Sequence, residues 1–247
     1  MCEPDLARWR ELLDYREVWV FTIALVAALP LLGYIRFRRF LAQASPVLSQ
    51  AGKFGLYARI ASTQWLLAAA MALILRRHGL SMADAGERFG DRYATLTATG
   101  GLLMILAIVA ALVLRCVRRS PAENLSGAMG RVRMMAPATA QEFAAFALVC
   151  ATAGICEELL FRGWLVSLLW AATRSRWAAV AIGGVLFGAG HAYQGVRGVL
   201  RTGFVGLQLG ILFVLLGSLI PGQALHAGVD LLAGAASVAI ASRTKAA

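Results

Sequence analysis

Apolar and polar positions alternate along this chain in long blocks. Runs of 16 to 21 apolar residues lie between short polar stretches, and the first three such runs are Val18–Ile35, Ile60–Leu75 and Ala94–Leu114. A helix needs roughly 20 mostly apolar residues to cross a hydrocarbon layer about 30 Å thick. Each of these runs therefore predicts a membrane-spanning helix.

From residue 141 onward the apolar runs also contain polar groups. Four runs follow, at Gln141–Thr173, Trp177–Tyr193, Gly203–Leu216 and Gln223–Ala241. The first would be about 50 Å long as one helix, so it must tilt, kink at Gly154 or Gly163, or divide in two. We predict an all-α, polytopic transmembrane bundle of about seven spans, within a range of six to eight.

Composition supports a membrane protein. Of the 247 residues, 60% are hydrophobic, where roughly 45 to 50% is typical of globular domains, and the mean hydropathy is +0.70. The 24 Lys and Arg against 13 Asp and Glu lie mainly between the apolar runs, where they set orientation and contact anionic lipid headgroups. No basic patch carries interleaved aromatics, so nucleic-acid binding is not expected.

The basic residues also predict the topology. Residues 36–59 hold five Lys and Arg without an acid, and residues 115–140 hold five with one acid. Because positive loops stay on the cytoplasmic side, both loops are expected inside and the N-terminus outside. We divide the chain into a three-span region (1–140), a C-terminal membrane domain (141–241) and a polar tail (242–247).

Two adjacent acids and an arginine interrupt the long run in the C-terminal domain. These are Glu157, Glu158 and Arg162. Ionisable groups inside a membrane helix cost several kcal/mol unless they are paired or face a wet cavity. Four residues bring Glu158 and Arg162 onto one face as an ion pair, whereas Glu157 points about 100° away. The spacing leaves Glu157 free for chemistry.

Two of the chain's three histidines lie in later runs. His191 follows Phe187 by four residues, and His226 precedes Asp230 by four, so each pair shares a helical face. Taken singly, the ion pair can be structural and each histidine an interhelical hydrogen-bonding group. Six ionisable residues within about 75 positions, with none in the first three predicted spans, favour a functional site.

These residues resemble a known family. Glu157-Glu158-x-x-x-Arg162, then Phe187-x-x-x-His191, then His226-x-x-x-Asp230 is similar to the three-motif signature of the CPBP family. This family comprises the type II CAAX-processing endopeptidases and bacterial relatives linked to bacteriocin self-immunity. The resemblance covers roughly residues 141–241. It implies an intramembrane endopeptidase, in a bacterial inner membrane, that cleaves near the C-terminus of a lipidated or C-terminally anchored protein.

The resemblance also implies roles. Glu157 and His191 would activate the attacking water, and His226 with the residue at position 230 would stabilise the oxyanion; Glu158, Arg162 and Phe187 would support them. The family motif commonly ends in Asn where this chain has Asp230. An Asp donates a hydrogen bond only when protonated, so the departure questions an oxyanion contact there.

Metal use and function class leave alternatives open. Glu157, His191, His226 and Asp230 are chemically suited to bind Zn²⁺ as in metalloproteases. No His-Glu-x-x-His sequence is present, and we favour a metal-free, glutamate-dependent mechanism without a cofactor. The rival classes are a non-catalytic immunity factor or scaffold, and an ion-coupled transporter, because buried Glu and His also form proton relays.

One geometric condition must hold for any of these sites. An entire predicted span separates His191 from His226, so full crossings would place the two rings on opposite sides of the membrane. We predict that something shortens the path, and that the break at residues 217–222 lies inside the membrane where it lines a cavity.

Overall fold

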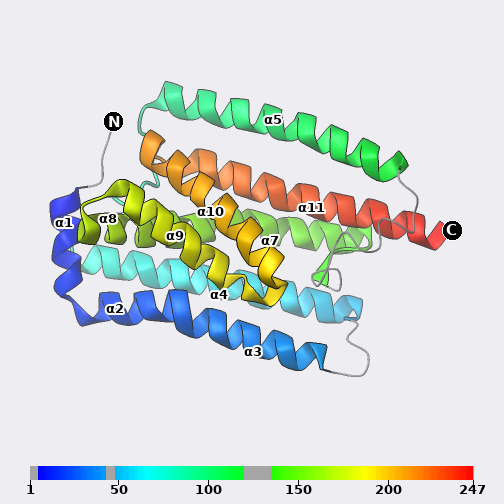
Figure 1. Cartoon of the computed structure of the whole chain (residues 1–247), viewed down its shortest axis with the longest axis horizontal. Helices are drawn as coiled ribbons and strands as arrows, with labels where there is room; N and C mark the ends of the chain where they lie inside the picture. Colours follow the sequence, from blue (N-terminus) through cyan, green and yellow to red (C-terminus); the bar gives the residue numbers. More distant parts are fainter. Residues whose placement is uncertain (1–4, 43–47, 120–134, 247) are drawn as a thin grey trace.

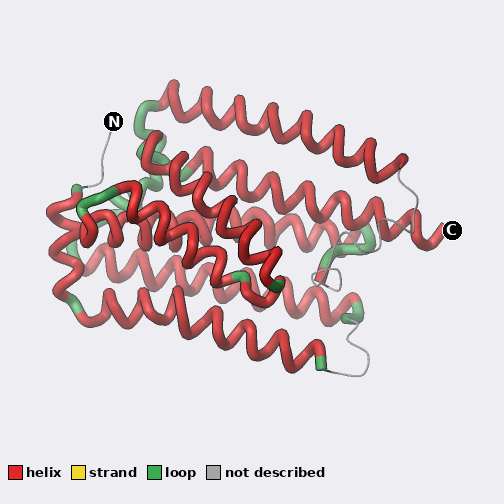
Figure 2. The backbone as a smooth tube through the Cα atoms, viewed as in Figure 1, coloured by secondary structure: helices red, strands yellow, loops and turns green. Residues whose placement is uncertain are grey.

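The computed structural model describes residues 5–42, 48–119 and 135–246. Over these residues the chain is helical and contains no strand. Figure 1 shows the long helices side by side as one bundle, and Figure 2 shows most connecting loops at its two ends. The predicted all-α bundle is confirmed.

The N-terminal part forms a short cross-piece, α1 and η1, followed by one long helical segment. Trp9, on the cross-piece, packs edge-on against Trp164 with ring centroids 6.0 Å apart. This long segment, Arg16–Leu41, continues through a π-helical turn and is long and apolar enough to span a membrane. The elements of the N-terminal part are α1 (Leu6–Glu11), the 3-10 turn η1 (Leu12–Asp14), α2 (Arg16–Ile23), the π turn η2 (Ala24–Ala28) and α3 (Leu29–Leu41).

Two further long helices complete the N-terminal region. Helix α4 (Gln50–Arg77) starts where Ser49 accepts a hydrogen bond from the Gly52 amide. Helix α5 (Arg92–Arg119) exposes most of its apolar side chains and packs along α11. An outward apolar face of this kind suits contact with lipid.

The long run at residues 140–173 is one continuous rod. It comprises α7 (Ala140–Glu158), the π-helical segment η4 (Leu159–Val166) and α8 (Ser167–Thr173). Of the six helices that could span a membrane, this rod has the largest buried share. The helix neither divides nor breaks at Gly154 or Gly163; it widens into a π-helix, a distortion often found at functional sites.

Three helices follow this central rod. They are α9 (Arg176–Gly190), α10 (Val196–Leu216) and α11 (Ile220–Ala246), with the 3-10 turn η5 (Ala192–Gln194) between the first two. A Cβ on Gly188 would lie 2.7 Å from the Val199 carbonyl oxygen, and one on Gly184 would lie 3.1 Å from the Leu207 nitrogen. Glycines thus let α9 and α10 pack at backbone distance.

Helix α9 explains the count of spans. Six helices in the described part of the chain are long and apolar enough to cross a membrane, and α9, with 15 residues, is shorter. Six full spans plus one short apolar helix match the predicted number of about seven.

A buried ion pair joins the N-terminal region to the rod. Lys53 Nζ, on α4, lies 2.8 Å from Glu142 Oε2, and both side chains are almost fully buried. Lys53 precedes the predicted second span, Ile60–Leu75, which itself contains no ionisable residue. The predicted span began at Ile60, whereas helix α4 starts ten residues earlier, and Gln50 and Lys53 in its first turns contact α7.

Figure 1 also bears on the topology. The C-terminal ends of α3 and α5 lie at the same end of the bundle, opposite α1. The two basic loops that follow these helices therefore begin on one side, as the predicted orientation requires; residues 43–47 and 120–134 of those loops lie outside the described residues.

Candidate active site

The two adjacent acids have different surroundings. Arg162 Nη1 lies 2.7 Å from Glu158 Oε1, and their side chains are 2% and 1% exposed. Arg162 Nη2 also donates to the Gly206 carbonyl on α10, and its guanidinium lies over the Phe187 ring, 4.3 Å from the centroid. The predicted ion pair is present, and it anchors the rod to α9 and α10.

Glu158 has a second partner that the sequence did not suggest. His226 Nδ1, on α11, lies 2.8 Å from the same oxygen, Glu158 Oε1. Because a carboxylate only accepts, Nδ1 carries the proton in this bond. The bond fixes the ring, and its other nitrogen Nε2 faces Glu157 Oε2 at 3.9 Å and Asp230 Oδ2 at 3.7 Å.

Glu157 is not joined to the arginine. Its Oε1 accepts a hydrogen bond of 2.6 Å from Gln64 Nε2, on α4, and its side chain is 19% exposed. Sequence reasoning missed Gln64, which lies outside the region that carries the family motifs. One signal was available, because Gln64 is the single amide side chain in the predicted second span.

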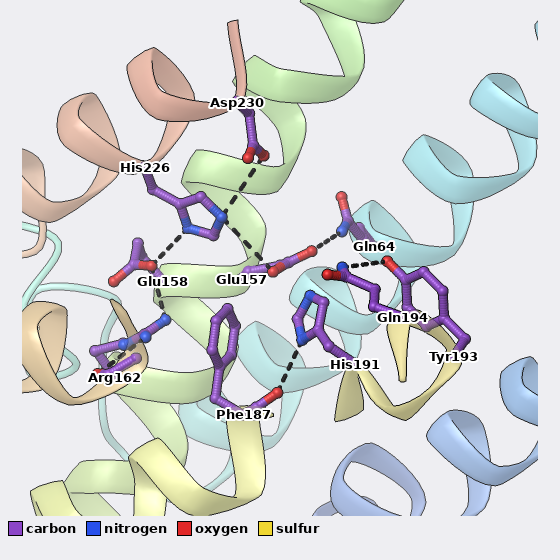
Figure 3. A network of polar contacts seen from close by, with 11 residues as sticks. Gln64, Glu157, Glu158, Arg162, Phe187, His191, Tyr193, Gln194, His226 and Asp230 are labelled. Carbon is purple, nitrogen blue, oxygen red and sulfur yellow. Dashed lines mark hydrogen bonds and ion pairs between the residues drawn. The ribbon is translucent and has the colours of Figure 1, made fainter. Parts of the chain in front are cut away.

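His191 lies just past the last residue of α9. Its Nδ1 is 2.8 Å from the Phe187 carbonyl oxygen, so Nδ1 donates and Nε2 is left for another partner. Figure 3 shows Nε2 turned toward the Glu157 carboxylate, although no hydrogen bond among the described contacts joins the two residues. Tyr193 lies beside it, 5.9 Å between ring centroids.

Phe187 brings the two imidazoles together. Its ring centroid is 4.8 Å from that of His191 and 6.0 Å from that of His226. The structure therefore gathers all the predicted site residues around one point between α4, the rod, α9 and α11 (Figure 3): Glu157, Glu158, Arg162, Phe187, His191, His226 and Asp230.

The short helix α9 is what lets His191 and His226 lie close together. Fifteen residues extend about 22 Å at 1.5 Å each, less than a hydrocarbon layer of about 30 Å, and Figure 2 shows the turn after it partway along the bundle. The predicted break at residues 217–222 instead lies at a bundle end. There Leu219 N donates to the Gly86 carbonyl and Ser218 Oγ donates to that of Arg88.

Exposure increases from one side of the site to the other. The side chain of Glu158 is 1% exposed, that of Glu157 19% and that of Asp230 40%. The arginine-paired acid lies deepest, whereas the other two acids are open to a substrate or water. The most exposed acid, Asp230, occupies the position where the family motif commonly has Asn.

We tested the side-chain arrangement against a metal ion. Over the described residues, no group of three or more His, Cys, Asp or Glu side chains is placed to hold one. His226 Nδ1 is bonded to Glu158, and Glu157 Oε1 is bonded to Gln64. The observed donor set does not form a ready metal site, and metal dependence stays open to direct measurement.

This architecture defines a class of protein. A polytopic helical bundle encloses carboxylates and imidazoles among apolar helices, an arrangement suited to proton transfer inside a membrane. Residues 139–232 match the family described as Rce1-like, type II CAAX prenyl endopeptidase Rce1-like. This match supports a CPBP family protease. Comparisons with curated proteins and with solved structures gave no match.

The family match supports a general activity, that of a CAAX-type intramembrane endopeptidase. The apolar helices and the family together support an integral membrane protein, and the family points to a protein substrate at a membrane. The matched region contains every motif residue of the site, but it excludes Gln64 on α4.

Proposed function

We propose that this protein hydrolyses a peptide bond near the C-terminus of a lipidated or C-terminally anchored protein in a bacterial inner membrane. The family description supports a C-terminal substrate. The site supports cleavage close to the bilayer, because its residues come from helices that could span a membrane and from the short helix between them. The basic loops would hold the enzyme against anionic lipid.

The observation that carries the mechanism is the contrast between the two acids. Glu158 is neutralised by Arg162 at 2.7 Å and holds His226. Among the described contacts, Glu157 accepts its hydrogen bond from the neutral amide of Gln64, and His226 Nε2 lies farther away, at 3.9 Å. An ionised carboxylate without a cation bonded to it is the better general base, so Glu157 is the proposed base.

The chemical step needs no covalent intermediate with the enzyme. Glu157 takes a proton from water as the water oxygen bonds to the scissile carbonyl carbon, which gives a tetrahedral oxyanion. Collapse re-forms the carbonyl and breaks the C–N bond, and the proton on Glu157 passes to the departing nitrogen, giving a carboxylic acid and an amine and regenerating the Glu157 carboxylate. His191 Nε2, with Nδ1 held by the Phe187 carbonyl, would help to orient the water.

His226 is placed to stabilise the oxyanion. With Nδ1–H bonded to Glu158, a protonated ring presents Nε2–H to the space between Glu157 and Asp230. A donor fixed in advance toward developing negative charge is among the largest contributions to catalysis. Asp230 Oδ2 faces the same nitrogen, so it would stabilise the imidazolium before the reaction. When the oxyanion forms, Nε2–H would donate its hydrogen bond to the oxyanion.

The test compares Glu157→Gln with Glu11→Gln, an exposed acid on α1. Purified protein in liposomes would receive peptides ending in a prenylated cysteine motif or in a hydrophobic anchor, and mass spectrometry would locate the cleavage. We expect Glu157→Gln to reduce cleavage at least about 100-fold, within the range seen for a lost general base, and Glu11→Gln to leave it unchanged.

The rival classes make different predictions in the same preparation. Cleavage that persists in Glu157→Gln would remove the glutamate mechanism. If the intact protein cleaves neither peptide type, and cells with and without it show the same membrane-protein C-termini, the non-catalytic class would be favoured. Proton-coupled uptake by the same liposomes would indicate a transporter. Metal analysis and chelator treatment of the active preparation would decide the role of zinc.

A further inference from the structure

Gln64 is a contribution of the N-terminal spans to the network around Glu157. It lies on α4, and its Nε2 donates to Glu157 Oε1 over 2.6 Å. The neighbouring Trp65 Nε1 donates to Thr152 Oγ1, one helical turn and a half from Glu157 on α7. Two successive side chains therefore fix α4 against the rod at the level of the site.

The partner of each acid determines what that acid can do. Arg162 is a cation that only donates hydrogen bonds, so it pairs with the Glu158 carboxylate. Gln64 is neutral, and its amide offers both donor and acceptor atoms. It fixes the position of the Glu157 carboxylate without supplying a positive charge.

The second atom of this amide is also informative. Gln64 Oε1 is buried and has no hydrogen-bond partner among the residues that the structure describes. Leaving a buried acceptor unpaired is unfavourable, and such groups in native proteins are few. After Glu157 has taken a proton, its O–H needs an acceptor, and a half-turn of the Gln64 amide would present Oε1 to it.

We infer that Gln64 is a positioning residue for the catalytic base, holding Glu157 by Nε2–H when it is ionised and by Oε1 when it is protonated. This inference rests on the proposed function. It assigns the N-terminal spans a part in the reaction, although the family match covers only residues 139–232.

Other charged or titratable groups face Glu157 as well, and each would influence its titration. They come from the rod, from the end of α9 and the following turn, and from α11: Glu158, Arg162, His191, Tyr193, His226 and Asp230. Substitutions at position 64 change none of these six residues, so a difference in pH dependence between a variant and the parent protein would originate at position 64.

The test uses two substitutions that should both lower kcat but should move the acidic limb of the pH profile in opposite directions. Gln64→Met keeps the length but removes the donor, so kcat should fall about 10- to 100-fold with KM nearly unchanged. The acidic limb of the pH profile should move to higher pH, because the bond that favours the carboxylate is lost. Gln64→Lys supplies a cation, so kcat should also fall while the acidic limb moves to lower pH.

The matched control is Gln50→Met on the same helix. Gln50 is exposed and donates to Gln141 Oε1, away from the site, so its substitution should leave both kcat and the pH profile unchanged. Elution as a single species from size-exclusion chromatography shows whether each variant folds, and either variant at position 64 suffices if the other does not fold.

Two results would overturn the inference. One is a Gln64 variant with wild-type kcat and an unmoved acidic limb; the other is a shift of both variants in the same direction, as a general structural role would give. Glu157→Gln, assayed in parallel, separates a failure of the proposed function from a failure of the role proposed for Gln64. If it is inactive while Gln64→Met is fully active, the proposed function stands and only the role of Gln64 falls.

Discussion

His226 Nδ1 lies 2.8 Å from Glu158 Oε1, the oxygen that also contacts Arg162 Nη1 at 2.7 Å. One buried carboxylate therefore holds both a cation from its own helix and an imidazole from α11. The preceding residue, Glu157, instead accepts its hydrogen bond from the neutral amide of Gln64. Adjacent acids in the sequence thus take separate parts, one organising the site and one positioned for chemistry.

Substitution of the two acids should separate stability from activity. In Glu158→Gln, Arg162 loses its counter-charge in a fully buried position, and breaking such a pair typically costs about 3–5 kcal/mol. We expect a markedly lower thermal unfolding midpoint in detergent together with lost cleavage. Glu157→Gln should lose cleavage with nearly the same midpoint, and equal midpoints for the two variants would contradict this division of roles.

Asp230→Asn should be tolerated better than Asp230→Leu. Asp230 is partly exposed and lies 3.7 Å from His226 Nε2 without a short bond. Asn keeps the size and an acceptor oxygen and adds a donor, so we expect activity within about tenfold of wild type, or 1.4 kcal/mol in transition-state stabilisation. Leu removes both polar atoms and should reduce kcat further. Equal activity of the two variants would show that position 230 does not act on His226.

The contact between α7 and α11 should be sensitive to a single methyl group. A Cβ at Gly154 would lie 2.7 Å from the Gln223 carbonyl oxygen and 2.8 Å from the Ala227 Cβ. Gly154→Ala must push α11 away from the rod, and overpacking of this kind typically costs about 1–3 kcal/mol. Because His226 is on α11, we expect both the unfolding midpoint and kcat to fall.

Gly100 provides the matched control for that substitution. It lies on α5, and a Cβ there would have nothing within 4 Å. Gly100→Ala should leave activity unchanged and stabilise the helix by up to about 1 kcal/mol. Loss of activity in Gly100→Ala comparable to that in Gly154→Ala would indicate a general sensitivity of the bundle instead of a local clash.

The Lys53–Glu142 pair allows a double-mutant test. Lys53 Nζ also donates to the Ala136 carbonyl, and Glu142 Oε2 also accepts from the Ala138 amide. Lys53→Met leaves the Glu142 charge buried without its lysine, so we expect a loss of about 3–5 kcal/mol. Adding Glu142→Leu should restore part of that stability. Purely additive losses, measured by chemical unfolding in detergent, would show that the pair is not coupled.

The sequence alone determined the local features of this protein. Apolar runs long enough to cross a bilayer predicted the helices, because burial in lipid is a property of each segment. The four-residue spacing predicted that Glu158 and Arg162 would pair and that Glu157 would not, because helical geometry fixes which side chains share a face. The three motifs, which are local patterns of the sequence, indicated the family.

Only the tertiary structure decided how these segments meet. Gln64 bonds to Glu157 across 93 positions of sequence, and His226 bonds to Glu158 across 68. Such contacts depend on the depth, rotation and crossing of separate helices, which no spacing within a single helix encodes. The short length of α9 and the π-helical turn after Glu158 are of the same kind, since they adjust where side chains from neighbouring helices lie.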